Sequence, residues 1–205
     1  LEQNSYSDLN NIDVGVRTLL EHIKNKDMIS LVVDPDVDGI CSSAILYNYL
    51  QIVTKEENLP EINWNIVTHS GKGHGLSDDI EVNPHTKLVI TPDGGSNDFE
   101  QHKKLKDANI DVLVIDHHVV DRESEDAIII NNQTSENYKN KAFSGVGVVY
   151  RFLQAIDDEL FTSHANDYLD LVALGNISDV MDTSDYETRY FIQQGILQKN
   201  LVNPF

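Results

Sequence analysis

The chain contains three short polar clusters with aspartates or histidines that could bind a metal ion. Each cluster comes directly after an apolar run. Apolar runs of this length predict buried strands. In open α/β sheets, ligands bind at the edge where the strands end. Separate strands that bring carboxylates and histidines to one edge would form a site for a hard metal ion. The clusters and the runs before them are residues 34–39 after 29–33, residues 93–95 after 88–90, and Asp116-His117-His118 after 112–115.

Aspartates alternate along the first cluster, at Asp34, Asp36 and Asp38. Alternate residues of an extended segment point to the same side, so this segment would present several carboxylates together. Gly39 would then permit a close turn into a helix. So dense a group of acids is unfavourable unless cations neutralise it, and carboxylates suit Mg²⁺ or Mn²⁺. A calcium-binding loop or a solvated turn is the alternative, which the preceding strand and the absence of a full EF-hand spacing disfavour.

The other clusters add further candidate ligands. Asp93 opens an Asp-Gly-Gly turn, which alone would be an ordinary β-turn. His117 supplies a nitrogen ligand, which Mn²⁺ accepts more readily than Mg²⁺ does. A carboxylate cage with few nitrogens indicates a two-metal centre that activates water for attack on phosphorus. Asp179 stands near the end of an apolar helical segment, and the pattern alone leaves its role undecided.

The hydrophobic periodicity predicts which elements position these clusters. Strands alternate with helices up to about residue 131, and the rest of the chain is helical. This alternation predicts an α/β fold with a mostly parallel, about five-stranded sheet, helices on both faces and a helical C-terminal portion from about residue 141. The expected strands are residues 28–33, 64–68, 87–91, 111–115 and 127–130, and the expected helices are residues 8–26, 39–53, 98–108, 145–156, 165–177 and 186–197.

The net charge, the cysteine count and the length of the apolar runs exclude several classes of protein. The chain has 205 residues and a net charge of -19, which argues against a broad basic surface that grips nucleic acid. Bound divalent cations would still permit a local phosphate site. The single cysteine, Cys41, excludes an internal disulfide. No apolar run is long enough to span a bilayer and no signal-peptide pattern is seen, so we expect a cytoplasmic protein without a membrane partner.

The order of the clusters resembles the DHH phosphoesterase superfamily: Asp-x-Asp-Gly, an isolated Asp after a strand, Asp-His-His, and a late Asp. Within it, the chain most resembles the RecJ-like exonucleases, which degrade single-stranded DNA from 5′ to 3′. The resemblance spans about residues 28 to 198, and the ordered set is far more specific than Asp-His-His alone. The closer match rests on GHGLS at residues 73–77, FSGVGV with LQA at residues 143–155, and LDLVALG leading to SDV at residues 169–180.

The resemblance implies a catalytic DHH domain over residues 1–205 with two bound Mn²⁺ or Mg²⁺ ions. Asp36 and Asp93 would hold one ion. The second would be held by Asp38, Asp93, His117 and Asp179, with Asp93 bridging. Asp34 would join the ligands, because Val32 replaces a histidine that many relatives carry.

The resemblance also implies which residues meet the substrate. His118 would contact the scissile phosphate, and Asp116 would orient its neighbours. The polar loop after the second strand would add His69, Lys72 and His74. His74 departs from the aromatic residue expected in this Gly-x-Gly turn.

The implied substrate is single-stranded DNA or a short oligonucleotide. The DHH-associated C-terminal domain, which binds substrate, and the OB-fold are expected to be absent, so the missing domain of a parent protein would be a partner. A phosphodiesterase of short oligonucleotides or cyclic dinucleotides is one alternative, and the segment around Asp179 disfavours it. A non-catalytic scaffold of a replication complex is the other, and the retained ligand residues disfavour it.

Overall fold

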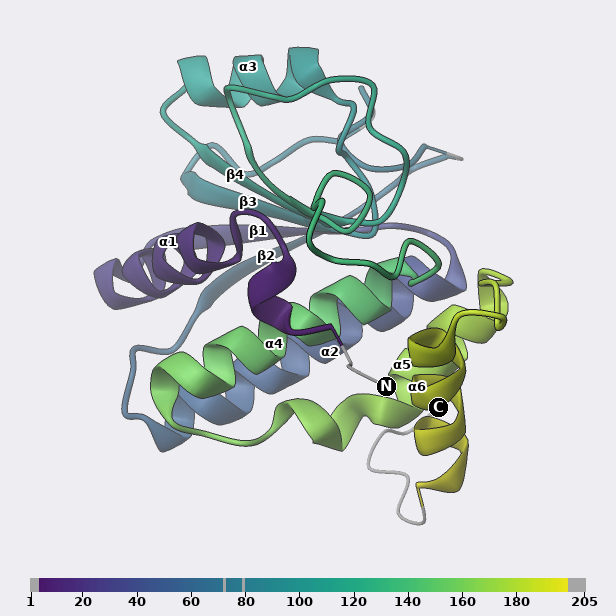
Figure 1. The fold of residues 1–205 in the computed structure, drawn as a ribbon. Helices are drawn as coiled ribbons and strands as arrows, with labels where there is room; N and C mark the ends of the chain where they lie inside the picture. Colours follow the sequence, from purple (N-terminus) through teal and green to yellow (C-terminus); the bar gives the residue numbers. More distant parts are fainter. Residues whose placement is uncertain (1–3, 72, 79, 199–205) are drawn as a thin grey trace.

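Five parallel strands form the centre of the computed structural model, which describes residues 4–71, 73–78 and 80–198 (Figure 1). Their order across the sheet is β2-β1-β3-β4-β5, and every neighbouring pair is parallel. The strands that precede the three polar clusters, β1, β3 and β4, are therefore neighbours, and their carboxyl ends meet at one edge. The strands are β1 (Met28–Val33), β2 (Asn63–Thr68), β3 (Thr86–Pro92), β4 (Asp111–Asp116) and β5 (Ile128–Asn131).

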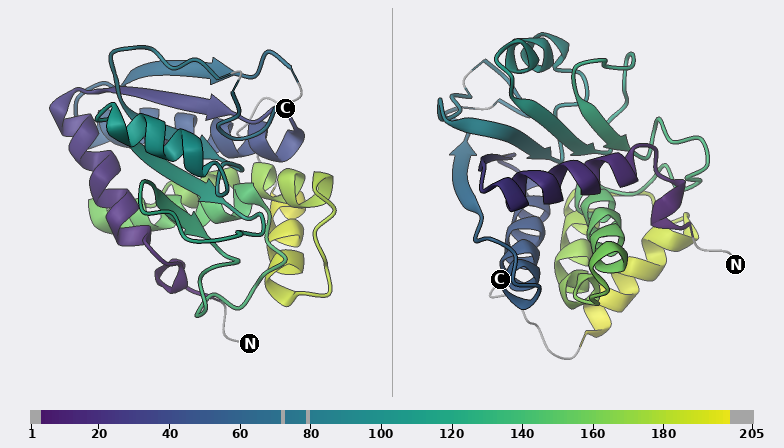
Figure 2. Two further views of the ribbon diagram at one scale, coloured as in Figure 1. Left: turned by 90° about the horizontal axis from the view of Figure 1, so that it is seen from above. Right: turned by 90° about the vertical axis from the view of Figure 1, so that its left-hand side faces the viewer.

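Helices cover both faces of this sheet, as the sequence predicts. On one face pack α1 (Ile12–Asn25), α2 (Val37–Glu56) and α4 (Gly145–Leu160) (Figures 1 and 2). The other face is covered by α3 (Phe99–Asp107) and by the loop that follows β2. Because the inner residues of a strand buried on both faces are mostly apolar, such strands show as near-continuous apolar runs in the sequence rather than alternating ones.

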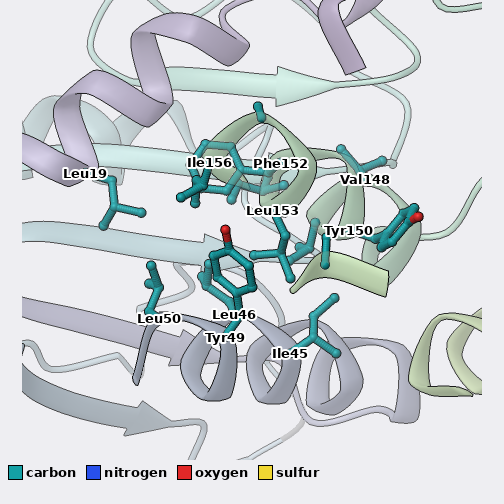
Figure 3. Close-up of a cluster of buried hydrophobic side chains, with 14 of the residues drawn as sticks. Leu19, Ile45, Leu46, Tyr49, Leu50, Val148, Tyr150, Phe152, Leu153 and Ile156 are labelled. Atoms are coloured by element: carbon teal, nitrogen blue, oxygen red, sulfur yellow. The ribbon is translucent and has the colours of Figure 1, made fainter. Parts of the chain in front are cut away.

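Large apolar side chains of α2 and α4 pack against one another beneath the sheet (Figure 3). Leu46, Tyr49 and Leu153 are fully buried there, and the Tyr49 hydroxyl donates a hydrogen bond of 2.9 Å to Asp157. Burying each such side chain stabilises the fold by about 1.5–3 kcal/mol. The packing fixes the first turns of α2 and α4 relative to each other, and both turns reach the candidate site.

The C-terminal portion is helical, as predicted, but its elements differ in detail. A 3-10 turn, η2 (Ala165–Tyr168), precedes α5 (Leu169–Ser178), so the prediction of one helix over residues 165–177 was wrong. The Asp157 carboxylate accepts hydrogen bonds from the amides of His164 and Ala165, which holds the chain in place where η2 begins. The last helix, α6 (Tyr186–Leu197), packs on α5 and has the predicted bounds.

The N-terminal helix is shorter than residues 8–26, so that prediction was also wrong. Ser5 caps a 3-10 turn, η1 (Tyr6–Asp8), and Asn11 then takes a left-handed backbone conformation with φ of 63°. Asparagine adopts this conformation more readily than most residues, and it delays the start of α1 to Ile12. Within the described residues, no helix combines the length and the apolar character that crossing a membrane requires.

Candidate metal centre

The chain leaves β1 and turns at once into α2, which separates the three aspartates of the first cluster. Asp36 is the N-cap of α2, and its carboxylate accepts a hydrogen bond of 2.9 Å from the amide of Gly39. The cap starts the helix at Val37, so Asp38 lies in the first helical turn. The expectation of one extended segment with three aligned carboxylates was therefore wrong beyond Asp36.

Asp34 is buried and holds the loop that follows β2. One carboxylate oxygen accepts a hydrogen bond of 2.8 Å from the amide of Gly75, and the other lies 2.6 Å from Nδ1 of His74. Nε2 of His69 lies 3.9 Å from the same carboxylate. Two of the predicted substrate-binding residues, His69 and His74, thus gather around Asp34. The third residue of this loop in the prediction, Lys72, lies outside the described residues.

Asp38 faces the start of α4. Its carboxylate accepts hydrogen bonds from the amides of Gly145, at 2.7 Å, and Val146, at 3.1 Å. These amides belong to the positive end of the helix dipole, which favours a negative group. Burial nevertheless raises the pKa of Asp38 above its ordinary value. The side chain is therefore rigidly held, and a cation at this position would be needed to stabilise its charge fully.

Asp93 is buried in the turn that follows β3. It takes a left-handed backbone conformation with φ of 66°, and its amide donates a hydrogen bond of 2.8 Å to the carbonyl of Ile115 in β4. Only 2% of the residue is exposed, and Oδ1 has no hydrogen-bond partner in the described part of the chain. Burial, with the charges of Asp38 and Asp36, raises the pKa of Asp93 far above its ordinary value.

Three carboxylates surround the imidazole of His117. Its Nε2 lies 3.3 Å from Oδ1 of Asp93, 3.6 Å from Oδ2 of Asp179 and 3.9 Å from Oδ2 of Asp38. Asp179 reaches this position because it is the C-cap of α5, which packs against α2. Three carboxylates, from the turn after β3, the first turn of α2 and the C-cap of α5, therefore converge on the imidazole that follows β4.

Asp116 and His118 form a separate pair beside that centre. The Asp116 carboxylate accepts hydrogen bonds from the amides of Ser96, His117 and His118, and it lies 2.7 Å from Nδ1 of His118. Burial disfavours its charge, but the hydrogen bonds and the charge of His118 outweigh burial and lower the pKa of Asp116. The same hydrogen bond outweighs burial at His118 and raises the pKa of that imidazole to about 9.

Three groups of possible ligand atoms result, and within each group the atoms lie within 4.8 Å of one another. Every residue predicted to bind metal belongs to at least one of them. His69 belongs to none. The groups are Asp93 with Asp116, His117 and His118; Asp34 with Asp36 and His74; and Asp38 with His117 and Asp179.

The donor atoms fit divalent cations. They are carboxylate oxygens with a few imidazole nitrogens, a set suited to Mn²⁺ and Mg²⁺. Asp93 and Asp38 are buried carboxylates whose pKa values are raised, and Oδ1 of Asp93 lacks a hydrogen-bond partner among the described residues. Buried charges require a partner of opposite sign, which divalent ions would supply.

Two glycines shape the site, and sequence reasoning assigned a role to neither. A Cβ at Gly145 would lie 2.1 Å from Oδ1 of Asp93, and one at Gly175 would lie 2.3 Å from Oδ1 of Asp38. Asn131 was also missed; its side chain donates a hydrogen bond of 3.0 Å to the carbonyl of His118. The sequence gives one signal that could have identified Gly145 and Gly175: both lie in the stretches that carry the family resemblance.

The fold and the site together define an open parallel α/β domain with a candidate metal centre at the carboxyl edge of its sheet. Residues 28–176 match the model of the DHH family, N-terminal domain. The chain therefore belongs to the DHH family, and the resemblance seen in the sequence is confirmed.

Similar proteins extend this assignment. The chain is 44% identical over 191 residues to the putative SPbeta prophage-derived single-strand DNA-specific exonuclease YorK of Bacillus subtilis, covering 93% of this chain and 32% of that protein. It is 28% identical to the single-stranded-DNA-specific exonuclease RecJ of Haemophilus influenzae, covering 91% of this chain and 34% of that protein. The chain thus spans about a third of the length of these relatives.

Solved structures share the fold. A manganese-bound exonuclease RecJ superposes with a TM-score of 0.76 at 22% identity, covering 92% of this chain and 48% of that one. RecJ from Thermus thermophilus in complex with Mn²⁺ gives a TM-score of 0.74 at 20% identity, covering 92% of this chain and 27% of that one.

Proposed function

We propose that this chain is the metal-dependent phosphodiesterase core of a RecJ-like exonuclease that removes nucleotides from the 5′ end of single-stranded DNA. The convergence of Asp38, Asp93 and Asp179 on His117 at the sheet edge is the observation that carries the proposal. The names of the similar exonucleases support the substrate. A cytoplasmic location is part of the same proposal.

Two divalent ions, Mn²⁺ or Mg²⁺, would bind in this centre. Asp36 and Asp93 would hold the first, with Asp34 beside them. The second would be held by Asp38, Asp93, His117 and Asp179. When bound, such ions lower the pKa of a water molecule and stabilise charge on the attacking and leaving oxygens.

His118 would bind the scissile phosphate. Its pKa of about 9 keeps the imidazole cationic at neutral pH, and more than half of its side chain is exposed. Asp116 fixes the ring through Nδ1, so Nε2 is the nitrogen that can donate to a phosphate oxygen. Asp116 therefore acts as a positioning residue and stays ionised itself. His69, Lys72 and His74 would add contacts from the loop after β2.

Residues 1–205 would form one DHH catalytic domain, with a helical subdomain from about residue 141. In a RecJ-like parent, a C-terminal substrate-binding domain and an OB-fold would supply affinity for long strands. The DHH domain would then supply the chemistry, and those partners would supply most of the grip on DNA.

A nuclease assay with Mn²⁺ tests the proposal on single strands labelled at the 5′ or the 3′ end, beside a cyclic dinucleotide. We expect release of the 5′ label as mononucleotides, loss of activity in Asp93→Ala, and retention in Asp107→Ala, an exposed aspartate on α3. Hydrolysis of the cyclic dinucleotide alone would assign a small substrate. Mn²⁺ binding without hydrolysis of either substrate would assign a scaffold.

A further inference from the structure

His74 belongs to one of the three groups of possible ligand atoms but is not among the residues proposed above to hold either ion. One ring nitrogen of His74 and one oxygen each of Asp34 and Asp36 lie within 4.8 Å of one another. Asp36 is exposed, and 63% of the His74 side chain is exposed. An ion can therefore reach this group from solvent without any change in the buried structure.

The hydrogen bonds of Asp34 determine which nitrogen of His74 is available. Both oxygens of this buried carboxylate are engaged, one by the amide of Gly75 and the other by Nδ1 of His74 at 2.6 Å. Nδ1 of His74 is thus engaged by Asp34, and Nε2 is the ring nitrogen left to bind an ion. Histidines that bind metals characteristically donate their other ring N–H to a carboxylate in this way.

The loop that carries His74 packs directly on the turn that carries Asp93. A Cβ at Gly75 would lie 2.7 Å from the amide nitrogen of Gly95, and one at Gly94 would lie 3.2 Å from Cα of Gly75. The carboxylate of Asp93 in this turn is buried, and its Oδ1 accepts no hydrogen bond among the described residues, although Nε2 of His117 lies 3.3 Å away on the other side of the proposed two-ion centre. The charge of Asp36 also acts on Asp93. Thus the loop that carries His74 lies against the turn that carries Asp93, and Asp36 is grouped with His74 and acts electrostatically on Asp93.

We propose that His74 is a metal ligand that joins Asp36 and Asp93 at the first ion position, with Asp34 as the residue that positions its ring. This inference rests on the proposed two-ion centre. It gives each ion position an imidazole nitrogen, His74 at the first and His117 at the second. Because Mn²⁺ accepts nitrogen ligands more readily than Mg²⁺, both positions would then favour Mn²⁺.

Counting Mn²⁺ ions by electron paramagnetic resonance tests this without any assay of activity. The intact chain should bind two ions, and His74→Phe should weaken one of them by about tenfold or more. His74→Phe should also reduce the preference of that position for Mn²⁺ over Mg²⁺ in competition. His85→Phe replaces an exposed histidine elsewhere and should change neither value. His117→Ala should weaken the other ion.

Nitrogen couplings to bound Mn²⁺ separate ligation from a general effect on the loop. With ¹⁵N-histidine labelling, pulsed measurements should detect coupled histidine nitrogens at both ions in the unmodified chain and at one ion in His74→Phe. Asp34→Asn should retain the coupling but weaken the ion by about tenfold, with circular dichroism confirming that this variant folds. Unchanged binding and couplings in His74→Phe, with an ion lost in His117→Ala, would overturn the role of His74 alone. A chain that binds no Mn²⁺ would instead refute the proposed two-ion centre.

Discussion

The carboxylate of Asp93 fills the space that any side chain at Gly145 would need. A Cβ on Gly145 would lie 2.1 Å from Oδ1 of Asp93, far inside van der Waals contact. Gly145 is also the first residue of α4, and its amide binds Asp38 at 2.7 Å. One glycine thus allows the start of a helix to approach two buried carboxylates at once.

Gly145→Ala should therefore damage the metal centre more than the fold. The new methyl group must displace either Asp93 or the start of α4, and overpacking of this kind costs about 1–3 kcal/mol. We expect the affinity for Mn²⁺ to fall by about tenfold or more, measured by calorimetric titration. Gly71→Ala is the matched control, because a Cβ there meets nothing within 4 Å. Normal Mn²⁺ binding in Gly145→Ala would show that the carboxylate has room to move.

Binding of divalent ions should release protons. In the metal-free protein, burial raises the pKa values of Asp38 and Asp93, so the centre retains a proton at pH 7 that an ion must displace. Because protons compete with the ion, affinity should rise with pH, by about tenfold per unit for each proton released. Calorimetry in two buffers of different ionisation enthalpy measures this number. Asp93→Asn should reduce the count, whereas Asp107→Asn should not; an affinity independent of pH would contradict the raised pKa values.

His118 should titrate near pH 9 in the metal-free protein. Its folded pKa is raised to about 9, so its pairing with Asp116 stabilises the fold fully below the ordinary histidine pKa, about 6.5, and is lost as pH rises through 9. A proton NMR titration of the imidazole measures the midpoint. Asp116→Asn should return it toward 6.5, whereas Asp121→Asn, on the exposed loop beyond, should leave it in place. A midpoint near 6.5 in the unmodified chain would refute the cationic phosphate contact.

The sheet and the approximate place of the site could be predicted because they follow from local patterns. β1 has the predicted bounds, and β3 and β4 each lie within a residue of theirs, since the inner residues of strands buried on both faces are mostly apolar. The three clusters had to share an edge once the strands were parallel. The first turn of α2 was misjudged because capping by Asp36 competes with an extended conformation, and both suit the same residues.

The rest of the site depends on contacts between distant parts of the chain. The roles of Gly145 and Gly175 follow from carboxylates that arrive from α2 and β3, and no local pattern encodes such an approach. The same holds for Asn131, whose partner is the carbonyl of His118. The sequence predicts which residue types meet at the carboxyl edge of the sheet. Which of their atoms lie in contact depends on the tertiary packing.

Val180→Gly should stabilise the protein. Val180 follows Asp179 and takes a left-handed conformation with φ of 53°, which is unfavourable for a β-branched residue by about 1–2 kcal/mol. Its amide and that of Met181 close the end of α5, at the position where helices commonly place glycine. The residue is 85% exposed, so little packing would be lost. We expect the melting temperature to rise by about 2–4 °C. Val119→Gly, also well exposed but without a positive φ, should bring no gain, and a fall in Val180→Gly would reveal a packing role.

Affinity for single-stranded DNA should depend little on strand length. The chain has 15 basic against 34 acidic residues, so it offers little cationic surface along which a phosphate backbone could run. Attraction should come from the ions and from His118, which act on the phosphates nearest the scissile bond. Fluorescence anisotropy with Ca²⁺, in place of a metal that supports hydrolysis, should give similar dissociation constants for short and long oligonucleotides, and a shallow salt dependence. Removal of Ca²⁺ with a chelator should abolish binding at every length, because repulsion from the acidic surface is then unopposed. Binding that strengthens steadily with length, or that survives chelation, would require a strand-tracking groove on this domain.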